Sequence, residues 1–288
     1  MKKIIWIISA VFLILACTLG ESAPLQAEDT PVESISAAES ATPLVPAEAT
    51  LPAALPAGPL TLVALGDSLT QGDGDDAGLG GYPGRLLEQV NAVRPGSTMT
   101  NLGQSGWNSD ALINGDQGLE SQLDRAITEL QNATAQGRGT VALVWIGSND
   151  LWYLYEYGGE INDEGDVQDL AHFEANMDLI LSRLRGSGAL VLVALLDDQS
   201  QRPVALKGEA FTAVTPDELK RMSVQATRYN EVITAKAAQY GALTVDFYNT
   251  DIFTNPATLY DDGNHPNSAG YEAITQKWWE ILSSSINP

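Results

Sequence analysis

The sequence predicts an α/β fold: a three-layer α/β/α sandwich in which one parallel sheet of about five strands lies between two layers of helices. Two observations lead to this prediction. From Leu60 onward, short runs rich in Val, Leu and Ile alternate with longer segments of helical periodicity. The short runs lack alternating polar residues, which is typical of strands buried on both faces. Such alternation favours right-handed crossovers, and ligands of parallel sheets bind at the carboxyl ends of the strands.

The strands and helices are expected in a regular order along the chain. The expected strands are Leu60–Leu65, Met99–Leu102, Thr140–Ile146, Leu190–Leu196 and Leu243–Phe247. The expected helices are Arg85–Val93, Leu119–Ala135, Phe173–Leu184, Pro216–Tyr240 and Ser268–Ser283. The fourth helix has the clearest boundaries, because a proline followed by two acids favours a helix start and Gly241 favours a helix end.

The N-terminal region is expected to lie outside this domain. Lys2 and Lys3 precede the apolar stretch Ile4–Leu15, so residues 1–20 are typical of a secretory signal. The segment before Cys17 is similar to a lipoprotein signal, in which the cysteine is acylated. Cleavage without lipidation and a retained helix are the alternatives.

A linker is expected between this signal and the domain. Residues 21–59 hold half of the prolines, and their Pro/Ala/Glu-rich composition indicates a disordered segment. The folded domain is therefore expected over residues 60–288. The protein is expected to be exported, either secreted or held at the cell surface as a lipoprotein.

The acidic composition excludes several classes of partner. The chain has a formal net charge of −22, and from Leu60 onward 31 acidic residues face 13 basic ones. Such a surface repels phosphates, so neither nucleic acid nor an anionic bilayer is an expected partner. Contact with a membrane is expected only through an N-terminal lipid. Cys17 is the only cysteine, so the domain has no disulfide, cysteine nucleophile or thiolate-bound zinc.

Four short polar motifs follow the expected strands. They are Gly66-Asp67-Ser68-Leu69-Thr70, Asn101-Leu102-Gly103-Gln104-Ser105-Gly106, Gly147-Ser148-Asn149-Asp150 and Asp261-Asp262-Gly263-Asn264-His265-Pro266. Each motif alone is a weak signal, but the four in this order resemble the GDSL, or SGNH, hydrolase family from roughly Leu60 to the C-terminus. The resemblance implies a flavodoxin-like sandwich, hydrolysis of carboxylic esters, and neither a cofactor nor a metal.

The residue types in these motifs suit ester hydrolysis by a nucleophilic serine. The hydroxyl of Ser68 becomes reactive when a base takes its proton, and His265 is suited to that role. Asp262 lies three residues before His265, so a single turn can bring its carboxylate to the imidazole. Asp261 is the alternative partner. Activity is expected to fall when acid protonates the base.

The oxyanion that forms during attack needs hydrogen-bond donors. The resemblance implies that these are the backbone N–H groups of Ser68 and Gly106 and the side chain of Asn149. Gly103 is an alternative to Gly106. Asp67 and Asp150 are expected to hold turn backbone in place rather than to act chemically.

The acidic, glycine-rich loop and the second histidine have other interpretations. Gly72-x-Gly74 superficially matches a dinucleotide fingerprint, but its intervening acids would repel a pyrophosphate. These acids could hold calcium, although a solvated acidic loop is the simpler interpretation. His172 is expected at a solvated helix position with no nearby partner.

Two loops are candidates for substrate contact. The aromatic run 151–157 follows the third motif and could form one wall of the site, and the segment 197–215 could form the far rim. Many members of the family have a proline-rich turn after the fourth strand, whereas here Asp197 and Asp198 follow.

The expected function is an esterase or lipase that cleaves small-molecule or glycan-borne esters through an acyl-enzyme. Carbohydrate acetyl esterase, lysophospholipase and thioesterase activities are all compatible with the resemblance. The alternative is a non-catalytic, surface-tethered binding module on the same fold.

Overall fold

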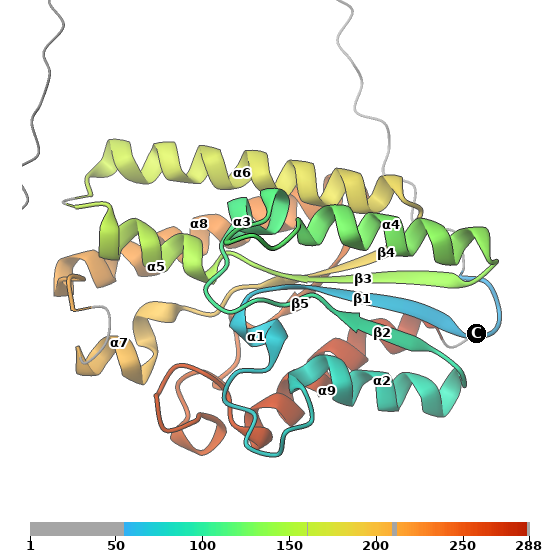
Figure 1. The fold of residues 1–288 in the computed structure, drawn as a ribbon. Coiled ribbons are helices and arrows are strands. Elements are labelled where there is room, and N and C mark those ends of the chain that lie inside the picture. Colours follow the sequence, from blue (N-terminus) through green and yellow to red (C-terminus); the bar gives the residue numbers. More distant parts are fainter. Residues whose placement is uncertain (1–54, 160, 209–211, 287–288) are drawn as a thin grey trace, which may run out of the picture. The chain divides into compact units, whose positions relative to one another are not determined.

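The computed structural model describes residues 55–159, 161–208 and 212–286. The predicted signal, the lipidation at Cys17 and most of the linker lie outside these residues. The described residues form a five-stranded parallel sheet in the order β2-β1-β3-β4-β5. Helices cover both faces of the sheet (Figure 1). The predicted three-layer sandwich is therefore confirmed.

The strands and helices have the following bounds. The strands are β1 Leu60–Gly66, β2 Thr98–Asn101, β3 Gly139–Trp145, β4 Leu190–Leu195 and β5 Leu243–Asp246. The helices are α1 Ser68–Gln71, α2 Gly81–Val93, α3 Ser109–Asn114, α4 Gln122–Ala135, α5 Ser148–Tyr157, α6 Asp163–Gly186, α7 Pro203–Lys207, α8 Pro216–Tyr240 and α9 Ser268–Ile286. In Figure 1, α2 and α9 cover one face, whereas α4, α6 and α8 cover the other.

The expectation that all strands are buried on both faces is wrong for the two edge strands. β1 and β3 are buried at every residue, but the residues of β2 are exposed or half-buried. β5, at the opposite edge, has a single buried residue, Val245. An edge strand has a neighbour on one side only, and strand order cannot be read from local periodicity.

An aromatic cluster lies between the sheet and the layer of α2 and α9. The ring of Trp145, at the end of β3, stacks on Phe247 with centroids 4.1 Å apart. Trp145 also meets Phe253 and Trp278 edge-on, and Trp278 stacks on Tyr82. All five side chains are buried. The cluster supports the carboxyl ends of β3 and β5 from one side.

The helix caps explain where the observed boundaries differ from the expected ones. α8 matches the prediction, and Thr215 and Glu218 form a reciprocal capping box at its start. α6 begins ten residues before the expected Phe173, because the side chain of Asn162 accepts the backbone N–H groups of Glu164 and Gly165. The short helices α1, α3, α5 and α7 were not expected.

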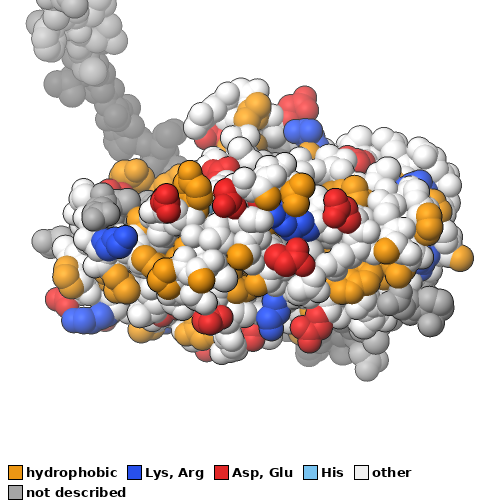
Figure 2. Space-filling view, turned by 90° about the horizontal axis from the view of Figure 1, so that it is seen from below, with side chains coloured by type: hydrophobic (Ala, Val, Ile, Leu, Met, Phe, Trp, Pro, Cys, Tyr) orange, Lys and Arg blue, Asp and Glu red, His pale blue; other side chains and the backbone are white. Residues whose placement is uncertain are grey.

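No helix of the described residues is long and apolar enough to cross a bilayer. On the face shown in Figure 2, acidic and basic side chains are interspersed with hydrophobic ones. The acidic excess of the chain therefore does not form one continuous patch on this face.

Candidate active site

The polar motifs meet where the direction of the strand order changes. The chain passes from β1 outward to β2, and from β3 outward in the other direction to β4. The carboxyl ends of β1 and β3 therefore border the crevice in which open parallel sheets bind ligands. Ser68 follows β1 and Asn149 follows β3.

Ser68 is the first residue of α1 and is 9% exposed. The preceding Asp67 caps this helix, because its Oδ1 accepts the Leu69 N–H at 3.0 Å. Gly66 has a φ of +157°, and a Cβ there would lie 2.2 Å from the carbonyl oxygen of Trp145. Glycine thus permits a tight turn between strand and helix that holds the Ser68 hydroxyl at the end of β1.

His265 bridges Ser68 and Asp262. The distance from His265 Nε2 to Ser68 Oγ is 3.0 Å, and that from His265 Nδ1 to Asp262 Oδ2 is 2.6 Å. Asp262 Oδ1 accepts the backbone N–H groups of Asn264 and His265 at 2.8 and 2.9 Å. Partial burial raises the pKa of Asp262, but the bonds from His265 and Asn264 outweigh it and hold this pKa below its usual value. The imidazole therefore contacts an ionised Asp262, and not the alternative Asp261.

The loop after β2 packs against α1. The backbone N–H of Gln104 donates to Gly66 O at 3.0 Å, and that of Ser105 donates to Gln71 Oε1 at 2.6 Å. A Cβ on Gly103 would lie 2.3 Å from the backbone nitrogen of Gln71. Gly103 therefore permits the close approach of this loop to α1.

The loop after β2 also accepts hydrogen bonds from side chains of α5. Tyr153 donates its hydroxyl proton to Gly106 O at 2.6 Å, and Asn149 Nδ2 donates to Trp107 O at 2.9 Å. The predicted donors Gly106 and Asn149 are thereby brought to neighbouring positions. Within the described residues, the N–H groups of Ser68 and Gly106 have no hydrogen-bond partner, whereas Gly103 N–H donates to a side chain. The first two N–H groups are thus free to bind an oxyanion.

Two buried carboxyl groups underlie these loops. Burial raises the pKa of Asp67 to about 7, although the bond from Leu69 N–H acts against it. Burial also raises the pKa of Asp150 to about 6, against the hydrogen bonds from Ser109. Both groups accept backbone N–H bonds, as expected for residues that hold turns. Asp150 thus connects the start of α3 to α5, next to Asn149.

The expectation that His172 has no nearby partner is wrong. Its Nε2 lies 2.9 Å from both carboxylate oxygens of Asp110, and this bond raises the pKa of His172. The side chain is 60% exposed and lies on α6, as expected. Asp110 is 62 residues away in the chain, so no local pattern could reveal the pair.

The glycine-rich loop after α1 is a structural support for the site. The side chain of Asp75 is 2% exposed and accepts two hydrogen bonds from the guanidinium of Arg85, at 2.6 and 2.9 Å. Asp76 accepts the N–H of Ser268 at the start of α9. A Cβ on Gly74 would lie 2.9 Å from His265 Cβ. The interpretation as a solvated acidic loop is therefore wrong for Asp75, which ties the loop to α2.

No group of three or more His, Cys, Asp or Glu side chains in the described part of the chain is arranged to hold a metal ion.

A polar pocket of about 370 Å³ adjoins Gly106. Its lining includes Tyr153, from the aromatic run 151–157, together with acids and amides of the segment around α3. These are Asn108, Asp110, Asn114, Asp116 and Gln117. Trp152 and Tyr155 from the same run are buried in the core. Tyr153 is thus the residue of this run that lines the pocket.

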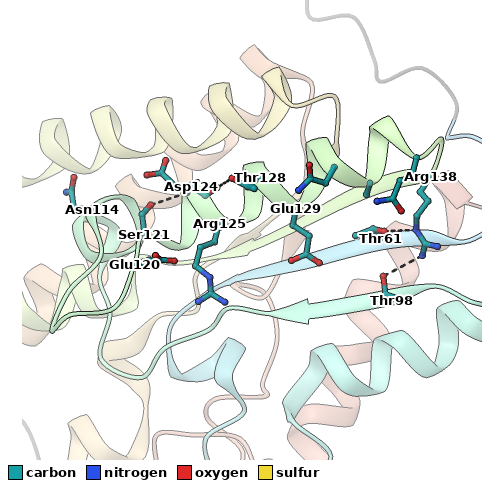
Figure 3. Close-up of a pocket in the computed structure, with 13 residues that line it drawn as sticks. Thr61, Thr98, Asn114, Glu120, Ser121, Asp124, Arg125, Thr128, Glu129 and Arg138 are labelled. Carbon is teal, nitrogen blue, oxygen red and sulfur yellow. Dashed lines mark hydrogen bonds between the residues drawn. The ribbon is translucent and has the colours of Figure 1, made fainter.

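A separate groove of about 920 Å³ lies between α4 and β2 (Figure 3). Two of its side chains bond to neighbouring strands: Arg138 Nε donates to Thr61 Oγ1 at 2.7 Å, and Glu129 accepts from Thr100. None of the predicted site residues lines this groove.

Comparisons with known proteins give a matching family and solved structures of similar fold. The model of the GDSL-like Lipase/Acylhydrolase family matches residues 64–273. A variant of Axe2, an acetyl xylan esterase from Geobacillus stearothermophilus, is 21% identical; the match covers 81% of this chain and 99% of that chain, with a TM-score of 0.52. The psychrotrophic esterase EstA from Pseudoalteromonas sp. is 17% identical; the match covers 79% of this chain and 99% of that chain, with a TM-score of 0.53. The lipase Lip_vut3 from a goat rumen metagenome is 19% identical; the match covers 77% of this chain and 96% of that chain, with a TM-score of 0.55. No curated protein matches the chain.

Proposed function

Because the chain belongs to the GDSL-like lipase/acylhydrolase family of ester-cleaving hydrolases, we propose that it is an exported esterase with a Ser68–His265–Asp262 triad. The observation that carries this proposal is the continuous series of hydrogen bonds from Asp262 through the imidazole to Ser68 Oγ. The alternative, a non-catalytic binding module, gives no reason for this alignment.

The first half of the reaction forms an acyl-enzyme. His265 Nε2 takes the hydroxyl proton of Ser68 while Oγ attacks the ester carbonyl carbon, and Asp262 stabilises the imidazolium that results. The carbonyl oxygen becomes an oxyanion, which the N–H groups of Ser68 and Gly106 stabilise. Asn149 contributes the second N–H of its Nδ2, because only one of the two donates to Trp107 O. The carbon–oxygen bond to the alcohol then breaks, and His265 returns its proton to the leaving alcohol oxygen.

The second half releases the acid. A water molecule gives a proton to His265 Nε2 and attacks the acyl carbon, so that the oxyanion forms again at the same donors. When this intermediate collapses, the bond to Ser68 Oγ breaks and the imidazolium returns the proton to the serine. The products are a carboxylic acid and an alcohol, and the enzyme is regenerated.

The polar pocket beside Gly106 favours esters of a polar alcohol. Amide, carboxylate and phenol groups line it, and these pair with hydroxyl groups better than with a hydrocarbon chain. Asp110 and Asp116 in the lining would repel an anionic group. We therefore propose acetyl or other short acyl esters of sugars as substrates. The solved structure of Axe2, which has a similar fold, is that of an acetyl xylan esterase and supports this proposal.

Hydrolysis of a p-nitrophenyl ester series from acetate to laurate, and of acetylated xylo-oligosaccharides, tests this proposal. We expect the wild type to prefer acetate and to release acetate from the oligosaccharide. Ser68→Ala should lose both activities and its labelling by a fluorophosphonate. If the wild type cleaves no ester and takes no fluorophosphonate label, the enzyme proposal fails. If it prefers laurate, the sugar-ester proposal fails.

Export and anchoring are tested separately. In a bacterial host, Cys17 should incorporate labelled palmitate and direct the protein to the membrane fraction, because an acylated cysteine anchors a lipoprotein. Cys17→Ala is the control. Release of unlabelled wild type into the medium would indicate secretion without lipidation, and retention in the cytoplasm would contradict export.

A further inference from the structure

The loop between β4 and α8 is bonded to the turn that carries Asp262 and His265. Arg202 lies in this loop, and its side chain is 2% exposed. Its Nε donates to Asp197 Oδ2 at 2.8 Å, and its Nη2 donates to Asp197 Oδ1 at 2.7 Å. Its Nη1 donates to Asn264 Oδ1 at 2.8 Å. One guanidinium therefore connects the end of β4 to a residue that lies between Asp262 and His265.

Backbone and packing contacts accompany this connection. Val204 N–H donates to Gly263 O at 3.0 Å. Gly263 has a φ of +68°, and a Cβ there would lie 3.1 Å from Pro203 Cβ. The guanidinium carbon of Arg202 lies 4.5 Å from the ring centre of Phe253, which is buried. The two segments are thus in close contact around Arg202.

Stability alone is a weak reason for this arrangement. Removing both charges of a buried ion pair from water offsets much of their attraction, and well-packed apolar residues often stabilise a protein as well. What the guanidinium adds is geometry, because its planar N–H groups donate in fixed directions. Two of these N–H groups donate to Asp197, and this fixes the guanidinium so that a third donates to Asn264.

We infer that Arg202, oriented by Asp197, is a positioning residue for the turn from Asp262 to His265. It acts through Asn264, whose backbone N–H donates to Asp262 Oδ1. Holding the Asn264 side chain keeps the Asp262 carboxylate directed at the imidazole, and so keeps Nε2 directed at the serine. This inference rests on the proposed function, in which His265 is the catalytic base.

Asn264→Ala tests the inference with the least disturbance. It removes the acceptor of Arg202 Nη1 but leaves the ion pair and the backbone in place. We expect kcat for a cleaved ester to fall by about 10- to 100-fold, as for a slightly misplaced catalytic group. KM should change by less than about twofold, whereas Tm should fall by a few °C, because the buried Nη1 loses its acceptor. Wild-type kcat in this variant overturns the inference.

Arg202→Lys, alone and combined with Asn264→Ala in a double variant, distinguishes positioning through Asn264 from two independent effects on kcat. Lysine keeps the charge but lacks the planar fork, so Arg202→Lys should lower kcat to a similar extent and also lower Tm. If Arg202 acts through Asn264, the double variant loses no more kcat than the more affected single variant. A loss equal to the product of the two single losses overturns the inference.

Arg185→Lys is the matched control. Arg185 donates to the carbonyl oxygens of Tyr240 and Ala189 at the other end of the sheet. This substitution should lower Tm without changing kcat. A comparable kcat loss here would show that any destabilising Arg→Lys change affects catalysis, which overturns the inference.

A spectroscopic measurement requires no substrate. In the proton NMR spectrum, the Nδ1–H of His265 held by Asp262 should give a low-field signal. Because the chain has two histidines, this signal is assigned by its loss in His265→Gln. Asn264→Ala should broaden or remove this signal, because the Asp262–His265 contact loosens. An unchanged signal overturns the inference. A wild type that cleaves no ester overturns the proposed function instead, and the signal still tests Arg202.

Discussion

The two ends of the sheet are stabilised by opposite kinds of side chain. At the carboxyl ends of the strands, carboxylates accept hydrogen bonds from backbone N–H groups. Asp67 accepts from Leu69, and Asp76 accepts from Ser268 at the start of α9. Arg85 and Arg202, at this end, are each paired with an aspartate.

At the amino ends, arginines donate to backbone carbonyl oxygens instead. Arg94 Nε donates to Ile286 O at the end of α9, at 3.0 Å. Arg185 Nε donates to Tyr240 O at the end of α8, at 2.8 Å. These contacts join helix ends on both faces of the sheet to neighbouring parts of the chain.

The difference follows from the direction of the backbone in a parallel α/β unit. Helices begin near the carboxyl ends of the strands with unpaired N–H groups, and they end near the amino ends with unpaired carbonyls. Carboxylates therefore suit one end and guanidinium groups the other. An acidic residue in a motif at the carboxyl end can thus be structural, as Asp67 and Asp75 show, and is not by itself evidence of catalysis.

The largest effect at the carboxyl end is expected from His265→Gln. Without a base, Ser68 keeps its proton, so kcat should fall by at least about 10⁴-fold. Stability should change little, because the imidazole is at the surface of the site. The matched control is His172→Gln, which should retain activity. Ester hydrolysis rates measure both, and a His265→Gln variant that retained a tenth of the activity would exclude His265 as the base.

Asp75→Asn should have the largest effect on stability. It removes the charged partner that Arg85 contacts most closely and leaves only the exposed Glu272, whose Oε2 lies 4.0 Å from Arg85 Nε, so the loss should be about 3 kcal/mol. Urea unfolding at pH 7 measures the loss. A loss below about 1 kcal/mol would show that the pair is not needed to hold the loop, since exposed pairs contribute no more than that.

The same pair gives the wild type an acid-dependent stability. The hydrogen bonds from Arg85 hold the pKa of Asp75 below its usual value, so this stabilisation is complete above about pH 4 and is lost as the pH falls further. Asp75→Asn should lack this component, and the difference between the two proteins should shrink at pH 3.

Asn149→Ala tests the third oxyanion donor. Loss of one such donor should lower kcat by roughly 100- to 1,000-fold, with KM nearly unchanged. The matched control is Asn132→Ala, since Asn132 is an exposed amide in the groove between α4 and β2. If the Asn149 variant kept wild-type kcat, its amide would serve only to bind Trp107 O.

The smallest effect is expected at the amino end. Arg138→Met removes donors to Thr61 Oγ1 and Leu60 O, which should cost about 1 to 3 kcal/mol. Because arginine does not titrate in this range, the loss should be the same at pH 5 and pH 8. Activity should not change. A pH-dependent loss, measured by urea unfolding, would contradict the proposed contrast between the ends.

Local sequence determined much of the fold and of the candidate site. Buried apolar runs and helical periodicity gave the α/β class, and the end of α8 follows from Gly241. The contact between Asp262 and His265 spans three residues, so it could be expected from spacing. The resemblance of the four motifs singled out Ser68, which lies 197 residues away from His265.

Only the tertiary structure decided which strands lie at the edges and which distant side chains meet. The pairs of Arg202 with Asn264 and of His172 with Asp110 each join segments about 60 residues apart. Hydrogen bonds within a turn depend on local backbone geometry, which a few residues specify. Bonds between segments depend on how helices and loops pack on the sheet, and no short stretch of sequence contains that information.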